Sequence, residues 1–263
     1  MSSLSLAVRD SSTMLRRNLL HARRYPSLTL NLLLTPVMLL LLFVYIFGDV
    51  MSAGIGDGGA DRSEYIAYLV PGILMMTIGG TTIGSAVSVA TDMNEGIIAR
   101  FRTMSIHRGS VLIGHVLGSV LQCVMSVVLV GAVAVAIGFR STDATVLEWI
   151  AAFGLLALFA LALTWIAVGM GLVSPNAEAA SNNAMPLIFL PLISTTFVPV
   201  DAMPGWFQPI AEYQPFTPAI ETLRGLLLGT EIGHNGWLVI VWCLALTVLG
   251  YFWSKASFNR DPE

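Results

Sequence analysis

Charged residues are scarce in this sequence, and their scarcity excludes a water-soluble protein. Only 11% of the 263 residues are Asp, Glu, Lys or Arg, whereas soluble domains carry about 25%. Apolar residues make up 56% of the chain, and the mean hydropathy is +0.78. Apolar stretches of about 20 residues, long enough to cross a bilayer as a helix, recur from near the start to near the end. We therefore expect residues 1–263 to form a single all-α integral membrane domain.

Lysine is almost absent, and this excludes ATP hydrolysis by a phosphate-binding loop. The lysine of that loop follows a glycine and precedes Ser or Thr, but the only lysine here, Lys255, stands between Ser254 and Ala256. The sequence also has no H-E-x-x-H metal motif and no G-x-S-x-G nucleophile elbow. We predict no catalytic residue, metal site or cofactor in this chain, and no nucleic-acid partner.

Ionisable residues are almost missing from the apolar runs, although secondary transporters and cation channels use them there. His115 is the main interior candidate, and Asp92 and Glu148 lie at the ends of runs. A neutral histidine that is hydrogen-bonded within the bundle is favoured over a proton relay. Cys123 and Cys243, the only two cysteines, lie inside apolar runs and are predicted to be buried free thiols.

Six apolar runs predict six transmembrane helices. They cover residues 28–47, 65–90, 111–138, 146–173, 182–200 and 237–253, and each can cross a hydrocarbon core of about 30 Å. An even number of spans places both termini on one side. If that side is cytoplasmic, the inner segments hold ten of the 13 Lys and Arg residues and the outer segments three. The positive-inside rule then predicts a multi-pass plasma-membrane protein with both termini in the cytoplasm.

Two further segments are predicted to be membrane-associated without spanning. Residues 5–25 have apolar residues at helical spacing beside a basic stripe, which predicts an amphipathic interfacial helix bearing Arg16, Arg17, Arg23 and Arg24. A disordered basic tail is the alternative. Eight of the 12 prolines lie between Pro175 and Pro218, so the fifth span should be irregular. The apolar segment 200–230 predicts short outer helices that dip into the membrane, or else a loop packed on the bundle.

Small hydroxyl residues recur at helical spacing in the second predicted span, and a further group lies in the fifth. The residues concerned are Thr77, Thr81, Ser85, Ser194 and Thr195. They can line a weakly polar translocation path for an amphiphile, or they can hydrogen-bond to neighbouring helices, and the sequence fits both interpretations. Two G-x-x-x-G patterns, Gly80 with Gly84 and Gly114 with Gly118, predict close helix packing.

Several segments together carry a resemblance to a known family. They are Tyr68-Leu69-Val70-Pro71-Gly72 in the second span, Glu95-Gly96 followed by Arg100-Phe101-Arg102 in the next loop, Phe197-Val198-Pro199, Met203-Pro204-Gly205-Trp206, and Gln214-Pro215-Phe216-Thr217-Pro218 ahead of Arg224. In this order and spacing, essentially the whole chain resembles the ABC-2 type transport permeases, in the group that includes the daunorubicin-resistance export permeases. One departure is Phe197-Val198, where many relatives have a Ser-Gly pair.

The resemblance implies a subunit that works with a separate ABC ATPase. In such permeases a short helix in the loop after the second span docks in a cleft of the ATPase, so Glu95, Gly96, Arg100, Phe101 and Arg102 are implied to carry the coupling. Topology alone would also place arginines in this loop, whereas an aromatic residue flanked by arginines has the composition of an interface anchor. The implied partners are two copies of the ATPase, which bind the ATP and Mg, a second copy of this chain, and membrane lipids.

We therefore predict a non-catalytic permease subunit of an ATP-driven exporter that moves an amphipathic drug-like or lipid-like compound. The alternative from another class is a passive channel or a membrane scaffold without transport. The sequence leaves import, and a heterodimer with a second permease, open.

Overall fold

Within residues 26–48, 62–96, 108–141 and 144–259, which the computed structural model describes, the chain is folded into helices and contains no strand. Four of these helices are long and apolar enough to cross a membrane: α4 (Arg62–Asn94), α6 (Arg108–Ala136), α7 (Val146–Val173) and α12 (Asn235–Phe258). α2 (Pro26–Tyr45) contains a shorter apolar segment, Leu34–Tyr45. The fold class is thus as predicted, while the count of six spans stays a prediction.

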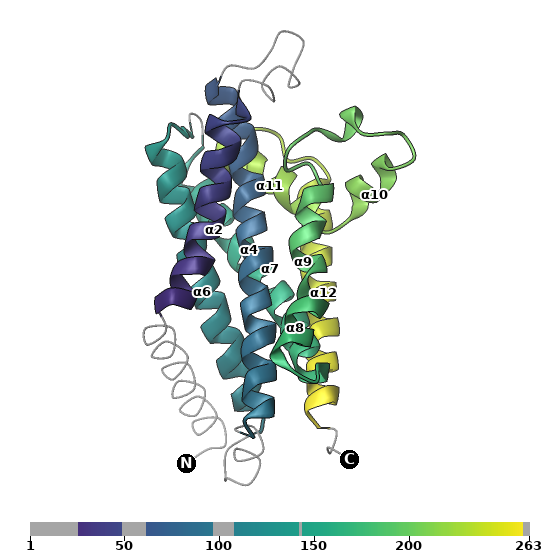
Figure 1. Cartoon of the computed structure of the whole chain (residues 1–263). Helices are drawn as coiled ribbons and strands as arrows, with labels where there is room; N and C mark the ends of the chain where they lie inside the picture. Colours follow the sequence, from purple (N-terminus) through teal and green to yellow (C-terminus); the bar gives the residue numbers. More distant parts are fainter. Residues whose placement is uncertain (1–25, 49–61, 97–107, 142–143, 260–263) are drawn as a thin grey trace.

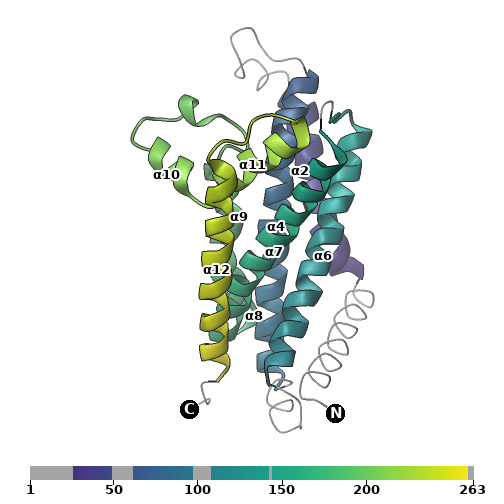
Figure 2. The same cartoon turned by 180° about the vertical axis from the view of Figure 1, so that it is seen from behind.

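α4 is the central helix of the bundle. It lies among α2, α6, α7, α8, α9 and α11 and contacts all of them (Figures 1 and 2). Of an 18-residue apolar window in α4, 78% is buried. In α6 and α12 the buried shares are only 28% and 17%. Both helices therefore turn most of their apolar surface outward, as expected where hydrocarbon or another protein surface replaces water.

The fifth predicted span is broken, as its prolines indicated. α8 (Ala177–Ala184) begins at the N-cap Asn176, whose side chain accepts a hydrogen bond from the Ala179 amide. α9 (Pro186–Phe189) and the 3₁₀-helix η1 (Leu190–Ile193) follow. Pro186 and Pro191 supply no backbone N–H for a helical hydrogen bond, so residues 177–193 cannot continue as one regular α-helix.

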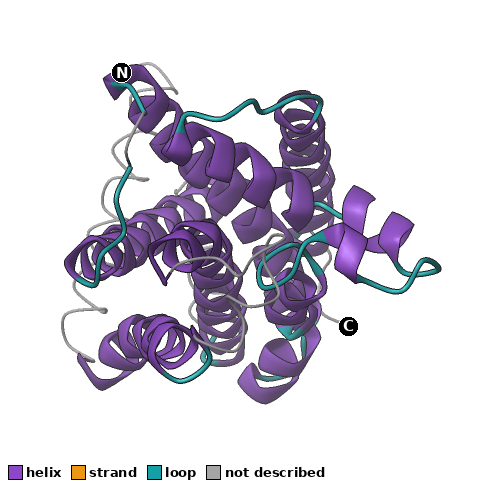
Figure 3. Ribbon diagram, turned by 90° about the horizontal axis from the view of Figure 1, so that it is seen from above, coloured by secondary structure: helices purple, strands orange, loops and turns teal. Residues whose placement is uncertain are grey.

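Short helices gather at one end of the bundle between η1 and α12. η2 (Val200–Ala202), α10 (Gln208–Tyr213) and α11 (Phe216–Leu228) lie there, and η2 and α10 project to one side (Figures 1 and 3). The opposite end holds α8 and the C-termini of α4 and α12. We call these the α11 end and the α8 end. The prediction of short helices in 200–230 is confirmed, and their insertion into the membrane stays a prediction.

Close packing in the bundle depends on glycines that let backbones meet. A Cβ atom on Gly79 of α4 would lie 2.3 Å from the carbonyl oxygen of Leu187 in α9, and one on Gly171 of α7 would lie 2.5 Å from the carbonyl oxygen of Ala86. A Cβ on Gly80 would only make ordinary contact with Ile188, at 3.7 Å. The close approach that the G-x-x-x-G pattern suggested at Gly80 is therefore made by its neighbour, because Gly79 faces the broken helix.

Some predicted features lie outside the described residues. The interfacial helix over residues 5–25 is one of them, together with Arg16, Arg17, Arg23 and Arg24. Arg100, Phe101 and Arg102 of the coupling loop are the others.

Candidate functional site

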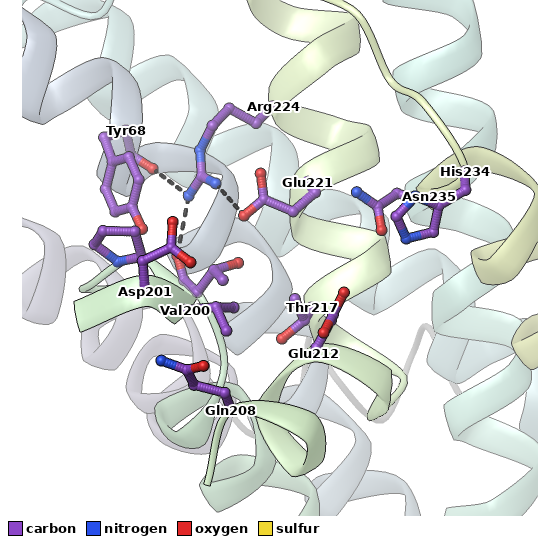
Figure 4. A pocket seen from close by; sticks show the side chains of 12 residues that line it. Tyr68, Val200, Asp201, Gln208, Glu212, Thr217, Glu221, Arg224, His234 and Asn235 are labelled. Atoms are coloured by element: carbon purple, nitrogen blue, oxygen red, sulfur yellow. Dashed lines mark hydrogen bonds and ion pairs between the residues drawn. The ribbon is translucent and has the colours of Figure 1, made fainter. Parts of the chain in front are cut away.

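Arg224 joins three separate parts of the chain at the α11 end. Its Nη1 atom pairs with the Glu221 carboxylate, one turn earlier on α11. Its Nη2 atom donates to two backbone carbonyl oxygens, that of Tyr68 on α4 at 3.1 Å and that of Thr195 after η1 at 3.0 Å (Figure 4). The guanidinium carbon also lies 3.9 Å from the centroid of the Tyr68 ring, a cation–π distance. Arg224 thus fixes α11 to α4 and to the segment after η1.

A glycine permits this junction. A Cβ on Gly72 would lie 2.6 Å from the Thr196 methyl carbon and 2.8 Å from its Cα, so α4 and the chain after η1 meet too closely for any side chain. The segment itself is held by the Pro191 carbonyl, which accepts hydrogen bonds from the hydroxyls of Ser194 (2.5 Å) and Thr196 (2.8 Å). The backbone carbonyl of Thr195 is therefore held in place where Arg224 binds it.

Gln214 fixes the start of α11 to the same region. Its Nε2 atom lies 3.4 Å from the Leu190 carbonyl oxygen and 3.3 Å from the Thr217 hydroxyl, and its Oε1 accepts from the Phe216 amide at 3.3 Å. The Phe216 ring packs edge-on against Phe159 of α7, with ring centroids 5.0 Å apart. The Gln-Pro-Phe-Thr-Pro segment is thus a structural anchor for α11.

A pocket of about 420 Å³ opens beside Arg224, and we call it the Arg224 pocket (Figure 4). Its lining comes from α4, the chain after η1, η2, α10, α11 and the start of α12: Tyr68, Thr195, Pro199, Val200, Asp201, Gln208, Glu212, Thr217, Glu221, Arg224, His234 and Asn235. Three carboxylates against one guanidinium leave it a formal charge of −2 with His234 counted as neutral. Its volume falls within the range of small-molecule sites, about 300–1,000 Å³.

The predicted path residues occupy two different places. Thr77, Thr81 and Ser85 are buried in α4; Thr77 donates to the Ile73 carbonyl at 2.8 Å, and Thr81 donates within its own helix and lies 3.1 Å from the Cys123 sulfur. Ser194 and Thr195 lie instead at the α11 end, and of the five only Thr195 lines the Arg224 pocket. Thr77 and Thr81 thus bond mainly to carbonyls of their own helix rather than to neighbouring helices, and the role of all five in transport stays a prediction.

The α8 end brings His115 and Asp92 together. His115 Nε2 of α6 lies 3.1 Å from Asp92 Oδ2 of α4, with both residues buried. A partner for His115 within the bundle is thus present, and it is the carboxylate placed at a span end; the neutral form of the histidine stays a prediction. Just beyond, Glu95 and Gly96 close α4 with a turn in which Gly96 has φ +67°, a conformation that glycine adopts without strain.

In the sequence, Tyr68 and Arg224 mark the resemblance to the family. The sequence does not predict the contact between them or the carboxylates beside that contact. One signal was available for Arg224, because α11 is otherwise mainly buried and apolar. A buried guanidinium needs partners for its charge and its N–H groups. Asp201 and Glu212 give no such signal, since an acidic side chain is ordinary in a segment of prolines and short helices at the end of a bundle.

The sequence of this chain matches a known protein family. A sequence profile described as ABC-2 type transporter matches residues 10–228. The chain belongs to the ABC-2 type transporter family. Ten of the 12 residues that line the Arg224 pocket fall inside the match, and His234, Asn235 and α12 follow it.

Of three relatives of this ABC-2 chain, two are named as ABC transporter permeases. A daunorubicin resistance ABC transporter permease of Streptomyces coeruleorubidus is 30% identical over 228 residues, which cover 85% of this chain and 77% of that protein. A probable doxorubicin resistance ABC transporter permease of Mycobacterium tuberculosis is 22% identical over 81% of this chain and 75% of its own length. Nodulation protein J of Rhizobium meliloti is 25% identical over 82% of each chain. The predicted family is confirmed.

Proposed function

We propose that this ABC-2 chain is the membrane-spanning subunit of an ATP-driven exporter, energised by a separate ATPase chain and moving an amphipathic drug-like or lipid-like compound. The observation that carries the proposal is the family match over residues 10–228 in a chain whose single lysine lies outside any phosphate-binding loop. Relatives named as drug-resistance permeases support export. The ATP and Mg belong to the partner in this proposal.

α4 is the element through which we propose that the ATPase acts. It connects the turn at Glu95 and Gly96, two of the proposed coupling residues, to Tyr68 in the Arg224 pocket. Asp92 and Tyr68 are separated by about 36 Å along a helix that rises 1.5 Å per residue. Because α4 is buried against six other helices, displacement of its inner end shifts the whole bundle together.

A homodimer in the plasma membrane completes the proposal. Six spans with both termini in the cytoplasm place the α8 end inside and the α11 end outside, in keeping with the ten-to-three distribution of basic residues. The outward apolar faces of α6 and α12 offer surface both for the second copy and for lipid. A path for an amphiphile then forms between two copies, since one bundle is too thin to enclose it.

Reconstitution with the ATPase tests the proposal. The purified chain alone should hydrolyse no ATP, and vesicles holding both chains should move an amphiphilic dye only when ATP is present. Phe101→Ala should weaken ATPase association about 30-fold, because loss of a buried interface anchor costs about 2 kcal/mol. Ser257→Ala on α12 is the control, and it should behave as wild type.

Two results would contradict the proposal. ATP hydrolysis that survives complete removal of the partner would place the chemistry in this chain. Dye movement that proceeds equally without the ATPase would indicate a passive channel. If Phe101→Ala associates and transports as well as Ser257→Ala, the coupling role lies in another segment.

A further inference from the structure

We propose that the Arg224 pocket binds the protonated amine of a cationic amphiphile. The inference deepens the proposed function and rests on it for one statement, that the bound compound is the exported one. The negative charge of the pocket favours a cationic ligand. Glu221 neutralises Arg224, so Asp201 and Glu212 remain as two carboxylates whose side chains have no ion-pair or hydrogen-bond partner within the described ranges.

The uncharged groups of the pocket match the same ligand. Thr195 is only 3% exposed and lines the pocket, yet its hydroxyl has no hydrogen-bond partner among the described residues, and the same is true of the Tyr68 hydroxyl. Buried hydroxyls without partners are costly. An ammonium group has three N–H donors and no acceptor. The carboxylates offer acceptors for it, and the two hydroxyl oxygens, which are covered from solvent in this structure, can accept from it only after the side chains around them shift.

The arrangement suits an organic cation better than a metal ion or an anion. No group of three or more His, Cys, Asp or Glu side chains close enough to hold a metal occurs in the part of the chain that the structure describes, so the carboxylates are spread around the cavity. An anion would meet a net negative wall, because the Arg224 guanidinium already contacts Glu221 and two carbonyls. A volume of about 420 Å³ leaves room for more than an ammonium group.

Large apolar side chains are exposed on α10 and just before it, beyond the residues that line the pocket. α10 carries the pocket residue Glu212 between Ile210 and Tyr213, whose side chains are 53% and 58% exposed. Trp206, just before α10, is 76% exposed. The position of α10 is fixed by Trp242 of α12, whose indole N–H donates to the Tyr213 carbonyl at 3.0 Å. α10 therefore carries one pocket carboxylate and two exposed apolar side chains, which are available to the apolar part of a bound amphiphile.

A matched pair of fluorescent probes tests whether the Arg224 pocket binds a protonated amine. Dansylcadaverine carries a primary amine, and its N-acetyl derivative has the same aromatic group without the charge. Binding of both is measured by fluorescence anisotropy to the purified chain in phosphatidylcholine nanodiscs, whose lipid has no net charge. We expect the amine to bind more tightly than the acetylated probe, and its affinity to fall as salt is raised.

Two variants, each of which removes the charge of one pocket carboxylate, test which residues bind the amine. Asp201→Asn and Glu212→Gln should each weaken amine binding roughly five-fold, as for exposed ion pairs of about 1 kcal/mol, and should leave the acetylated probe unaffected. Glu231→Gln removes an equal charge from the exposed loop between α11 and α12, outside the pocket, and should bind the amine as wild type does. The three variants preserve side-chain shape, and the comparison of the two probes on the wild-type chain needs no variant at all.

The inference is overturned if the acetylated probe binds the wild-type chain as tightly as the amine, or if the double variant Asp201→Asn/Glu212→Gln keeps wild-type affinity. No ATPase takes part in this measurement. Charge-selective binding by a chain that fails the reconstitution would thus refute the proposed function alone. ATP-driven dye movement without charge-selective binding would refute this inference alone.

Discussion

Arg224 shows how one long side chain can organise the end of a membrane bundle. Two of its three hydrogen-bond acceptors are backbone carbonyls on different segments, and the third is Glu221 on its own helix. A guanidinium can serve all three because its N–H groups form a rigid planar fork, whereas a lysine ammonium is a compact charge with no such fork. The cation–π contact with Tyr68 adds a planar surface that lysine cannot match equally well.

Arg224→Lys should therefore lower the free energy of unfolding by about 2 kcal/mol, the scale of one lost hydrogen bond to a charged group. Unfolding of the purified chain in mixed detergent micelles measures this. Arg140→Lys is the control, because Arg140 also donates to backbone carbonyls, those of Val135 and Phe139, but is exposed. Equal stability of the two variants would show that Arg224 does not hold the α11 end together.

At the scale of elements, the broken helix α8–α9–η1 packs on α4 through contacts that leave no spare volume. The Leu187 carbonyl approaches Gly79 at a distance that no Cβ atom tolerates, and the obstacle is backbone, which cannot rotate away as a side chain can. The break at Pro186 and Pro191 frees backbone polar groups, and burial of that segment in protein is what makes such irregular backbone acceptable in a membrane. The close packing of α9 on α4 therefore buries the irregular backbone that the two prolines create.

Gly79→Ala should cost about 2 kcal/mol of stability, as expected for overpacking a buried contact. Gly154→Ala is the matched control on α7, since a Cβ there meets no atom within 4 Å, and alanine should gain up to about 1 kcal/mol from its helix propensity. Both are measured by the same detergent unfolding titration. A Gly79 variant as stable as the Gly154 variant would mean that α9 can move away from α4 freely.

The sequence predicts the long helices well and the junctions poorly, for a physical reason. The apolar run 146–173 coincides with α7 (Val146–Val173), and 111–138 differs from α6 (Arg108–Ala136) by a few residues, because helices in lipid must be apolar along their length. The break in the fifth span is also predicted locally, because proline interrupts a helix wherever it stands. The partners of Arg224 carry no such signal, since two of them are backbone carbonyls, which every residue has. Only the fold reveals which carbonyls they are.

At the scale of the whole molecule, the two ends of the bundle differ in chemistry. The α11 end carries the Arg224 pocket and its carboxylates, and the α8 end carries the paired His115 and Asp92. Between them, α4 is buried along most of its length while α6 and α12 are exposed. This asymmetry suits a subunit that receives a signal at one end and handles a ligand at the other, provided that the α11 end faces outward.

Cysteine labelling tests that orientation. In a background lacking Cys123 and Cys243, which are both buried, Gly205→Cys at the exposed α11 end should react with an impermeant maleimide in intact cells. Glu178→Cys, in the exposed first turn of α8, should react only after the cells are permeabilised. The reverse pattern would invert the topology and, with it, the proposed positions of the ATPase and the pocket.

The contact between Arg224 and Tyr68 also sets an order of events during synthesis of the chain. Tyr68 and Arg224 are 156 positions apart, and at a synthesis rate of about 5–20 residues per second the carbonyl of Tyr68 is made roughly 8–30 s before its partner. During that interval α4 has been synthesised but lacks the cation that later holds its N-terminal end. Membrane insertion of the early helices and closure of the α11 end are therefore separate events in the life of each chain, and the second begins only when α11 has left the ribosome.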